Sequence, residues 1–285
     1  MPKGLMVYFS QSGTTSKVAE SIARGARARG LDVEVASIRD KGPGETVGYD
    51  FFGIGSPVYA CRIPFNVSDY VGSLPDLEAV PTFSFNLYGT YPFDAGRQLR
   101  NLLARKGVRD VGYFSCRGAE YNLGYLQKGY LFSPDNPTSE DMAQAEAFGC
   151  EVADRVLGKE YSPVEAFNPP SLIYRLERML CDRFFIEQLM TRTFRVNAKS
   201  CNACGMCMKL CPNLNIKKDE NGRPKWGRHC LGCATCQMKC PKEAITSMLS
   251  MLGPMFDYNV RHMAADPTLQ FARVRHHNGR TERLQ

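Results

Sequence analysis

Eight of the 12 cysteines lie between residues 201 and 240, where they form two copies of one spacing. Each copy reads C-x2-C-x2-C-x3-C-P, the first beginning at Cys201 and the second at Cys230. Three thiolates on so short a loop can bind three irons of a cubane, and the proline then turns the chain away from the site. The spacing therefore predicts two [4Fe-4S] clusters.

The duplicated run resembles that of the two-cluster ferredoxins, in which the fourth cysteine of each run binds the cluster of the other run. The resemblance implies that cluster one is held by Cys201, Cys204, Cys207 and Cys240. It implies that cluster two is held by Cys230, Cys233, Cys236 and Cys211. Zinc is the alternative, because it also binds C-x2-C pairs. A tetrahedral zinc site gives no reason for the third cysteine, the x3 gap and the proline to occur twice, so the pattern favours iron and sulfur.

A second candidate site is a polar segment between the first expected strand and the first expected helix. Its hydroxyls, glycine and backbone amides at a helix N-terminus can bind a phosphate without an arginine. It lacks the G-K-[ST] ending of a nucleotide P-loop and the three glycines of a dinucleotide fingerprint, so a monophosphate fits better. Helix capping alone is the simpler alternative. The segment consists of Ser10, Gln11, Ser12, Gly13, Thr14 and Thr15.

Three more expected strands end in segments that could contact the same ligand, because open α/β sheets bind ligands outside the carboxyl ends of their strands. For the two tyrosines of these segments, ordinary core packing is the alternative. The segments are Pro57, Val58 and Tyr59 after the third strand, Asn86, Leu87, Tyr88, Gly89 and Thr90 after the fourth, and Cys116, Arg117 and Gly118 after the fifth.

The elements that must position these loops alternate along the first 160 residues, which predicts a doubly wound α/β domain with a parallel sheet. One connection in this region, residues 117–137, is long and rich in Gly, Tyr and Asn, and we expect it to be functional. The expected strands are 5–9, 33–38, 51–55, 82–87 and 108–115, and the expected helices are 14–29, 66–71, 95–106 and 138–157.

Taken together, these loops and elements make residues 1–160 resemble the flavodoxins. The resemblance implies a five-stranded parallel sheet of order 2-1-3-4-5 that binds FMN, with residues 10–15 at the phosphate and the later loops at the isoalloxazine. Residues 57–61 contain no glycine, unlike the second loop of many flavodoxins, and non-glycine residues resist positive φ. We therefore do not expect strong stabilisation of the one-electron-reduced flavin.

The remaining residues predict a linker and a second domain. Pro163 and the breakers at 168–170 lie in a linker region, 161–193, which also contains an expected amphipathic helix over 171–191. Residues 194–250 are expected to form a small α+β domain around both clusters, and residues 251–285 a basic C-terminal tail. The whole chain thus resembles the flavodoxin–ferredoxin fusion proteins.

Charge and hydropathy limit the classes of partner. The formal net charge of +7 counts every cysteine as neutral. Two clusters and the FMN phosphate would lower it to about +1, so we expect no nucleic-acid binding. No apolar run is long enough to span a membrane and no signal peptide is evident, which favours a soluble cytoplasmic protein.

Such a fusion is similar to electron-transfer proteins, because FMN accepts one or two electrons and each cluster accepts one. We expect a low-potential carrier that serves a redox partner such as a ferredoxin, an oxidoreductase or a reductase. The alternative is an FMN-dependent reductase of a small substrate, fed by its own clusters and covered by residues 117–137. A structural or sensory role of the clusters is a third possibility, and a homodimer is compatible with each.

Overall fold

The computed structural model describes residues 1–158, 178 and 181–284. Pro163, the breakers at 168–170 and residues 171–177, 179 and 180 of the expected helix over 171–191 lie outside the described residues. The described residues form two units. The first contains residues 1–118 and 135–158, and the second contains residues 119–134, 178 and 181–284.

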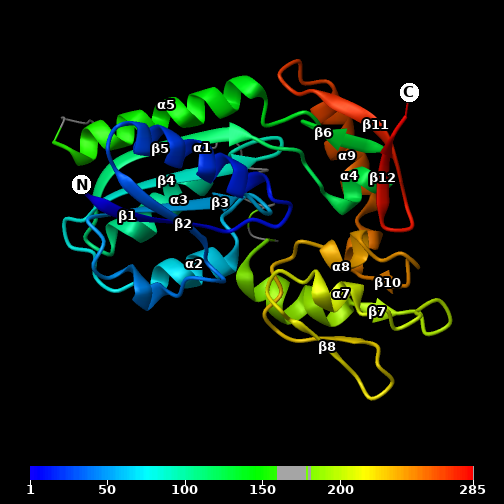
Figure 1. Cartoon of the computed structure of the whole chain (residues 1–285). Helices are drawn as coiled ribbons and strands as arrows, with labels where there is room; N and C mark the ends of the chain where they lie inside the picture. The colour runs from blue at the N-terminus through cyan, green and yellow to red at the C-terminus, as the bar shows by residue number, and fades with distance from the viewer. Residues whose placement is uncertain (159–177, 179–180, 285) are drawn as a thin grey trace. The chain divides into compact units, whose positions relative to one another are not determined.

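The first unit is built on a five-stranded sheet of order β2-β1-β3-β4-β5, in which every neighbouring pair is parallel (Figure 1). This order confirms the one expected from the sequence. Because β1 pairs with both β2 and β3, the loops that follow β1 and β3 flank the switch point where such sheets bind ligands. The strands are β1 Lys3–Tyr8, β2 Asp32–Ser37, β3 Phe51–Pro57, β4 Pro81–Tyr88 and β5 Arg109–Arg117.

Helices cover both faces of this sheet (Figure 1). α1 and α5 pack on one face, where Ile22 and Phe148 join the strand residues Met6, Phe83 and Phe85 in one apolar core. α2 and α3 contact each other, and α3 packs on β4 and β5. The helices, all four expected from the sequence, are α1 Thr14–Ala28, α2 Phe65–Gly72, α3 Ala95–Ala104 and α5 Ser139–Val156, with a short 3-10 turn η1 at Pro43–Thr46.

The cysteine-rich part of the second unit consists of two similar halves. In one half, Ile216 of β8 pairs with Trp226 of β9. In the other, Ile245 of β10 pairs with Val196 of β7, so the strand pairs repeat along with the cysteine runs. The elements are η2 Phe185–Leu189, η3 Met190–Thr193, β7 Arg195–Val196, α7 Met206–Lys209, β8 Ile216–Lys218, β9 Pro224–Trp226, α8 Thr235–Met238, β10 Ile245–Thr246 and η4 Met248–Met251.

The second unit also contains a three-stranded antiparallel sheet of order β12-β11-β6, made from segments far apart in the chain. Leu126 and Leu131 share a core with Met238 and Val274, and Lys128 forms an ion pair with Asp257 at 2.8 Å. The elements are α4 Leu123–Gln127, β6 Tyr130–Phe132, α9 Gly253–Ala264, β11 Phe271–His277 and β12 Arg280–Arg283.

These contacts correct two expectations. Residues 119–134 lie in the second unit instead of a continuous domain 1–160, because their apolar side chains pack with α8 and β11. Residues 251–285 were expected to be a tail, yet α9 buries Phe256, Val260 and Met263, and the chain then forms the β11–β12 hairpin. Over the described part of the chain, none of the helices has the length and apolar character needed to cross a membrane.

Candidate functional site

The loop after β1 leads directly into the N-terminus of α1. Gly13, immediately before the helix, has φ +84, a left-handed conformation that glycine adopts without steric cost. Ser16 Oγ donates to the carbonyl of Gly13 at 2.7 Å, and the hydroxyls of Ser12 and Thr14 are hydrogen-bonded at 3.0 Å. Gly13 is the N-cap residue and has no side-chain acceptor. Among the described residues, the first helical amides therefore have no N-cap side chain to which they could donate. The helix therefore presents amides that an anion can use.

Ser10, at the start of the same loop, has a buried hydroxyl. Its Oγ has no hydrogen-bond partner among the residues described by the structure. A buried hydroxyl normally has a partner, and leaving one unpaired costs about 1–3 kcal/mol. A phosphate oxygen would supply the missing acceptor, so this loop fits the phosphate end of FMN.

The second loop contacts the first through Tyr59. The hydroxyl of Tyr59 donates to the side-chain oxygen of Gln11, and its ring stands edge-on to Phe9 with centroids 6.1 Å apart. The chain then turns back: the amide of Tyr59 donates to Arg62 O at 2.8 Å, and the amide of Arg62 donates to Tyr59 O at 3.0 Å.

The turn between Tyr59 and Arg62 differs from the sequence expectation. Its two central residues, Ala60 and Cys61, have φ values of +47 and +64, although neither is a glycine. Each left-handed non-glycine residue costs about 1–2 kcal/mol. The two main-chain hydrogen bonds that close the turn offset this cost, so the absence of glycine does not prevent positive φ here.

Hydrogen bonds join the ends of β3, β4 and β5 and hold the third and later loops in place. The amide of Val58 donates to Leu87 O at 2.8 Å, and Asn86 Nδ2 donates to Ser56 O at 3.1 Å. The amide of Gly118 donates to Tyr88 O at 2.8 Å. The carboxyl edge of the sheet is therefore one connected surface.

The expected cofactor residues differ in how accessible their side chains are. Leu87 and Cys116 lie in the core beneath α1 and α5, and burial raises the pKa of Cys116 to about 12, so this thiol stays neutral at physiological pH. The Arg117 guanidinium lies 5.9 Å from the centre of the Tyr88 ring. The buried members are Thr15, Asn86, Leu87, Thr90, Cys116 and Gly118, the half-buried ones Ser10, Gly13, Thr14, Pro57, Val58, Tyr59, Tyr88, Gly89 and Arg117, and the exposed ones Gln11 and Ser12.

In the second unit, one cavity is lined by thiols from both cysteine runs. Its volume is about 20 Å³, and it is lined by Cys211, Cys230, Cys233 and Cys236, together with Trp226 and other residues. Burial raises the pKa of Cys230 to about 12 and also raises the pKa of Cys233 and of Cys236. The nearby indole of Trp226 opposes this increase in the pKa of Cys236.

The other cysteines also gather across the two runs. Burial raises the pKa of Cys207 to about 11, and the nearby thiols of Cys240 and Cys204 add to this increase. The thiol of Cys240, from the second run, is thus near enough to affect the pKa of Cys207, which belongs to the first. Cys201 is half-buried, and its amide donates to Asn197 O at 2.9 Å.

Backbone amides donate to the fourth cysteine of each run in the same way. The amide of Asn215 donates to Cys211 Sγ at 3.3 Å, and the amide of Ala244 donates to Cys240 Sγ at 3.3 Å. The amide of Gly232 donates to Cys230 Sγ at 3.4 Å. Such N–H donors stabilise a thiolate over a thiol, as a metal-bound cysteine requires.

Within the described ranges, no three His, Cys, Asp or Glu side chains converge as they would around a single metal ion. A cubane places each thiolate on a different iron, so its ligands surround a cavity instead of meeting at a point. Cys211 and Cys236 are arranged in this second way, because they line a cavity.

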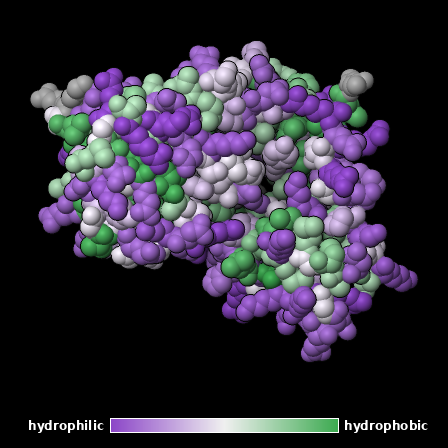
Figure 2. Space-filling model, viewed as in Figure 1, coloured by the Kyte–Doolittle hydropathy of each residue, from purple (hydrophilic) through white to green (hydrophobic). Residues whose placement is uncertain are grey.

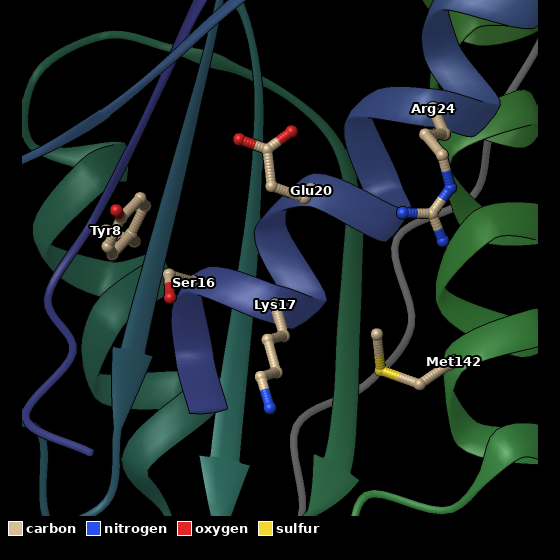
Figure 3. Close-up of a pocket in the computed structure, with 6 residues that line it drawn as sticks. All are labelled: Tyr8, Ser16, Lys17, Glu20, Arg24 and Met142. Carbon is tan, nitrogen blue, oxygen red and sulfur yellow. The ribbon is translucent and has the colours of Figure 1, made fainter. Parts of the chain in front are cut away.

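The first unit also has a surface depression of about 400 Å³ beside α1, to which the expected loops contribute no residue (Figure 3). Two of its side chains are already engaged, since Ser16 donates to Gly13 O and Arg24 pairs with Glu146 at 3.2 Å. It therefore adds nothing to the candidate site. Its lining residues are Tyr8, Ser16, Lys17, Glu20, Arg24 and Met142.

Comparison with known proteins finds a likeness for most of the first unit. Residues 5–131 match the family model described as a flavodoxin domain. Among solved structures, a flavodoxin from the domain Archaea is 20% identical, and the match covers 54% of this chain and 99% of that one with a TM-score of 0.43. Flavodoxin 2 from Bacillus cereus is 19% identical over 54% of this chain and 99% of that chain, with a TM-score of 0.45.

A curated relative matches a shorter stretch of sequence. The pyruvate synthase subunit PorD of Methanocaldococcus jannaschii is 40% identical over 60 residues, which are 20% of this chain and 70% of PorD. The chain therefore contains a flavodoxin domain over residues 5–131 and belongs to the family of PorD through a region of 60 residues.

Proposed function

We propose that this protein transfers electrons between FMN, bound by the first unit, and two [4Fe-4S] clusters, bound by the second, and passes them to or from a redox partner. The observation that carries the proposal is the cavity enclosed by Cys211, Cys230, Cys233 and Cys236. Four thiols drawn from both runs surround it, as the cross-binding pattern of two-cluster proteins requires.

The flavodoxin fold supports FMN as the cofactor of the first unit. In this proposal, residues 10–15 bind its phosphate, since no side chain of the described residues at the N-cap position caps α1 and Ser10 Oγ has no partner among them. Tyr59 and Tyr88 lie at the ends of β3 and β4 and would contact the ring system. When bound, FMN supplies a centre that takes up one or two electrons.

In the second unit, cluster two would be held by Cys230, Cys233, Cys236 and Cys211. Cluster one would be held by Cys201, Cys204, Cys207 and Cys240, a set supported by the influence of both Cys240 and Cys204 on the pKa of Cys207. Cys211 and Cys240 each accept from a backbone amide at the same distance of 3.3 Å. This equivalence supports a model in which the fourth cysteine of each run binds the cluster of the other run.

The partner we propose is an acidic redox protein that docks beside Cys240. Lys239 and Lys242 flank this cysteine and are exposed, and the β11–β12 hairpin carries exposed Arg275 and Arg280. The turn of that hairpin contacts the main chain of Lys239 and Cys240. Hydrophilic side chains gather over β11 and β12 on the visible face (Figure 2). Like PorD, named as a subunit of pyruvate synthase, the chain would serve a larger redox enzyme.

We do not extend the proposal to the reduction of a small substrate. That alternative used residues 117–137 as a cover for a pocket. In the structure Tyr125 packs edge-on against Phe132 and Phe256, with ring centroids 5.7 and 5.8 Å away, inside the second unit.

The test is an anaerobic redox titration of the purified, reconstituted protein, with iron, sulfide, zinc and FMN quantified on the same sample. We expect about eight irons and one FMN per chain and two reducible clusters that exchange electrons with the flavin. Zinc in place of iron, or no bound flavin, would contradict the proposal.

A further inference from the structure

Trp226, the single tryptophan of the chain, lies against the cavity of the second cysteine set. It is the last residue of β9, where it pairs with Ile216. Its ring stacks on Phe194 with centroids 5.0 Å apart and an interplanar angle of 14°. Both rings line the cavity, so Trp226 is held in one orientation beside the thiols.

The indole nitrogen of Trp226 is a buried donor that lacks a conventional acceptor. Nε1 has no hydrogen bond of regular geometry to any residue that the structure describes. The polar group that it approaches is the sulfur of Cys236, itself 8% exposed. Buried indole N–H groups usually have a partner. A thiolate at Cys236 is a much better acceptor than the neutral thiol, so this donor is placed for the metal-bound form.

The duplication of this part of the chain supplies an internal comparison. Ile216, five residues after Cys211, pairs with Trp226, whereas Ile245, five residues after Cys240, pairs with Val196. Trp226 and Val196 therefore hold equivalent positions in the two halves. Valine has no donor, so the indole N–H distinguishes the second cysteine set from the first.

We propose that Trp226 is a positioning residue that raises the reduction potential of cluster two by donating its N–H to the Cys236 sulfur. Reduction adds negative charge to a cluster, and a donor to a ligating sulfur stabilises the reduced form. The electron shared by the two clusters then rests on cluster two in preference to cluster one. The inference rests on the proposed function, because it requires both clusters.

The test compares Trp226→Phe with a matched control. Phenylalanine keeps an aromatic ring against Phe194 but removes the N–H, whereas Phe194→Leu disturbs the same stack and keeps the N–H. Each variant is reconstituted, checked for wild-type iron content, and titrated anaerobically with EPR detection. In Trp226→Phe we expect one cluster to move to a more negative potential, with about a tenfold change in the equilibrium between the clusters, or about 59 mV for one electron. The other cluster keeps its potential, and Phe194→Leu shows no selective shift.

A second replacement covers the case in which Trp226→Phe fails to retain its clusters. Because the chain has one tryptophan, biosynthetic incorporation of benzothienylalanine changes this site alone. The analogue keeps the bicyclic shape and replaces the N–H by sulfur. It should reproduce the selective shift.

Unchanged potentials of both clusters at full iron content, or equal shifts of both, would overturn the role of Trp226 and leave the electron-transfer proposal standing. Failure of the wild-type protein to bind two clusters would instead overturn the proposed function. Tryptophan emission gives a further readout, since a cluster beside Trp226 should quench it upon reconstitution. Unquenched emission of the cluster-loaded wild type would contradict the placement.

Discussion

Gly279 lies directly against the main chain of Lys239: a Cβ at Gly279 would be 2.9 Å from the carbonyl oxygen of Lys239. Gly279 and Asn278 both have positive φ and form the turn between β11 and β12. The amide of Asn278 also donates to Glu243 Oε1 at 2.7 Å. The hairpin is therefore attached at two points to the segment that carries Cys240.

Replacing Gly279 with alanine should destabilise the second unit. The substitution forces a side chain into φ +74 and into contact with Lys239 O, so we expect a loss of about 2–4 kcal/mol in unfolding free energy. Gly222→Ala is the control, because Gly222 has φ +73 and its Cβ would lie 3.8 Å from the nearest atom. The unfolding free energy of both variants is measured by urea unfolding, with the loss of cluster absorbance as the signal. Equal losses would show that the contact with Lys239 contributes nothing.

Cysteine substitutions should remove the clusters in the crossed pairing. Cys207→Ser and Cys240→Ser should each abolish the same cluster, because Cys207 and Cys240 lie close together. Cys236→Ser should abolish the other, leaving about four of eight irons in each case. Iron analysis and EPR provide the measurement. Cys150→Ser is the control, since its thiol donates to Gly25 O at 3.3 Å in the first unit. Loss of different clusters from Cys207→Ser and Cys240→Ser would contradict the pairing.

Ser10→Ala should have opposite effects on the two states of the first unit. Without FMN, removing an unpaired buried hydroxyl should stabilise the protein by about 1 kcal/mol. With FMN, the lost hydrogen bond should weaken binding about five- to thirtyfold, equivalent to 1–2 kcal/mol. Thermal unfolding of the apoprotein and fluorescence titration with FMN test the two halves. Ser16→Ala serves as the comparison, because its hydroxyl already donates to Gly13 O and its loss should destabilise the apoprotein. An apoprotein destabilised by Ser10→Ala would refute the assignment.

The stability of the hairpin should decrease in mild acid. Burial lowers the pKa of His276 below its ordinary value of 6.5, and its Nδ1 lies 2.8 Å from Thr281 Oγ1. The unfolded chain therefore binds a proton at a higher pH than the folded one, so this contribution is present above pH 6.5 and lost as the pH falls below it. Unfolding free energies measured between about pH 7.5 and 5.5 should decline less steeply in His276→Gln. Parallel declines would exclude His276 as the cause.

Electron exchange with an acidic partner should depend on the cationic residues beside Cys240. Replacing Lys239, Lys242, Arg275 and Arg280 by glutamate should slow association by about tenfold or more at low salt and weaken its salt dependence. Stopped-flow reduction by an acidic ferredoxin measures the rate. Lys217→Glu and Lys225→Glu, which alter exposed lysines of β8 and β9, provide the control. A rate equally sensitive to the control charges would argue against a specific docking face.

The parallel sheet was predictable because each of its strands is a local apolar run, and helices follow β1, β3 and β4 after short connections. The cysteine runs were predictable because the ligand spacing is itself local. The role of residues 119–134 was not, since β6 has three residues and pairs with β11 from the far end of the chain. A local signal for the hairpin did exist: Asn278-Gly279 between two β-rich runs is typical of a type I′ turn. The positive φ of Ala60 had no such signal, because hydrogen bonds impose it.

The insertion of residues 119–134 into the second unit affects the order in which the protein can be completed during synthesis. The parallel sheet needs only residues up to 117, and α5 follows soon after. β6 cannot form its strand pair at that stage, because its partner β11 is translated about 140 residues later. During that interval Leu131 and Phe132 have no strand to cover them, and an uncovered apolar edge favours aggregation. Truncation near the C-terminus, even beyond the last cysteine, should therefore leave the newly synthesised chain prone to misassembly. For the same reason, a single cut in the chain cannot separate the two units.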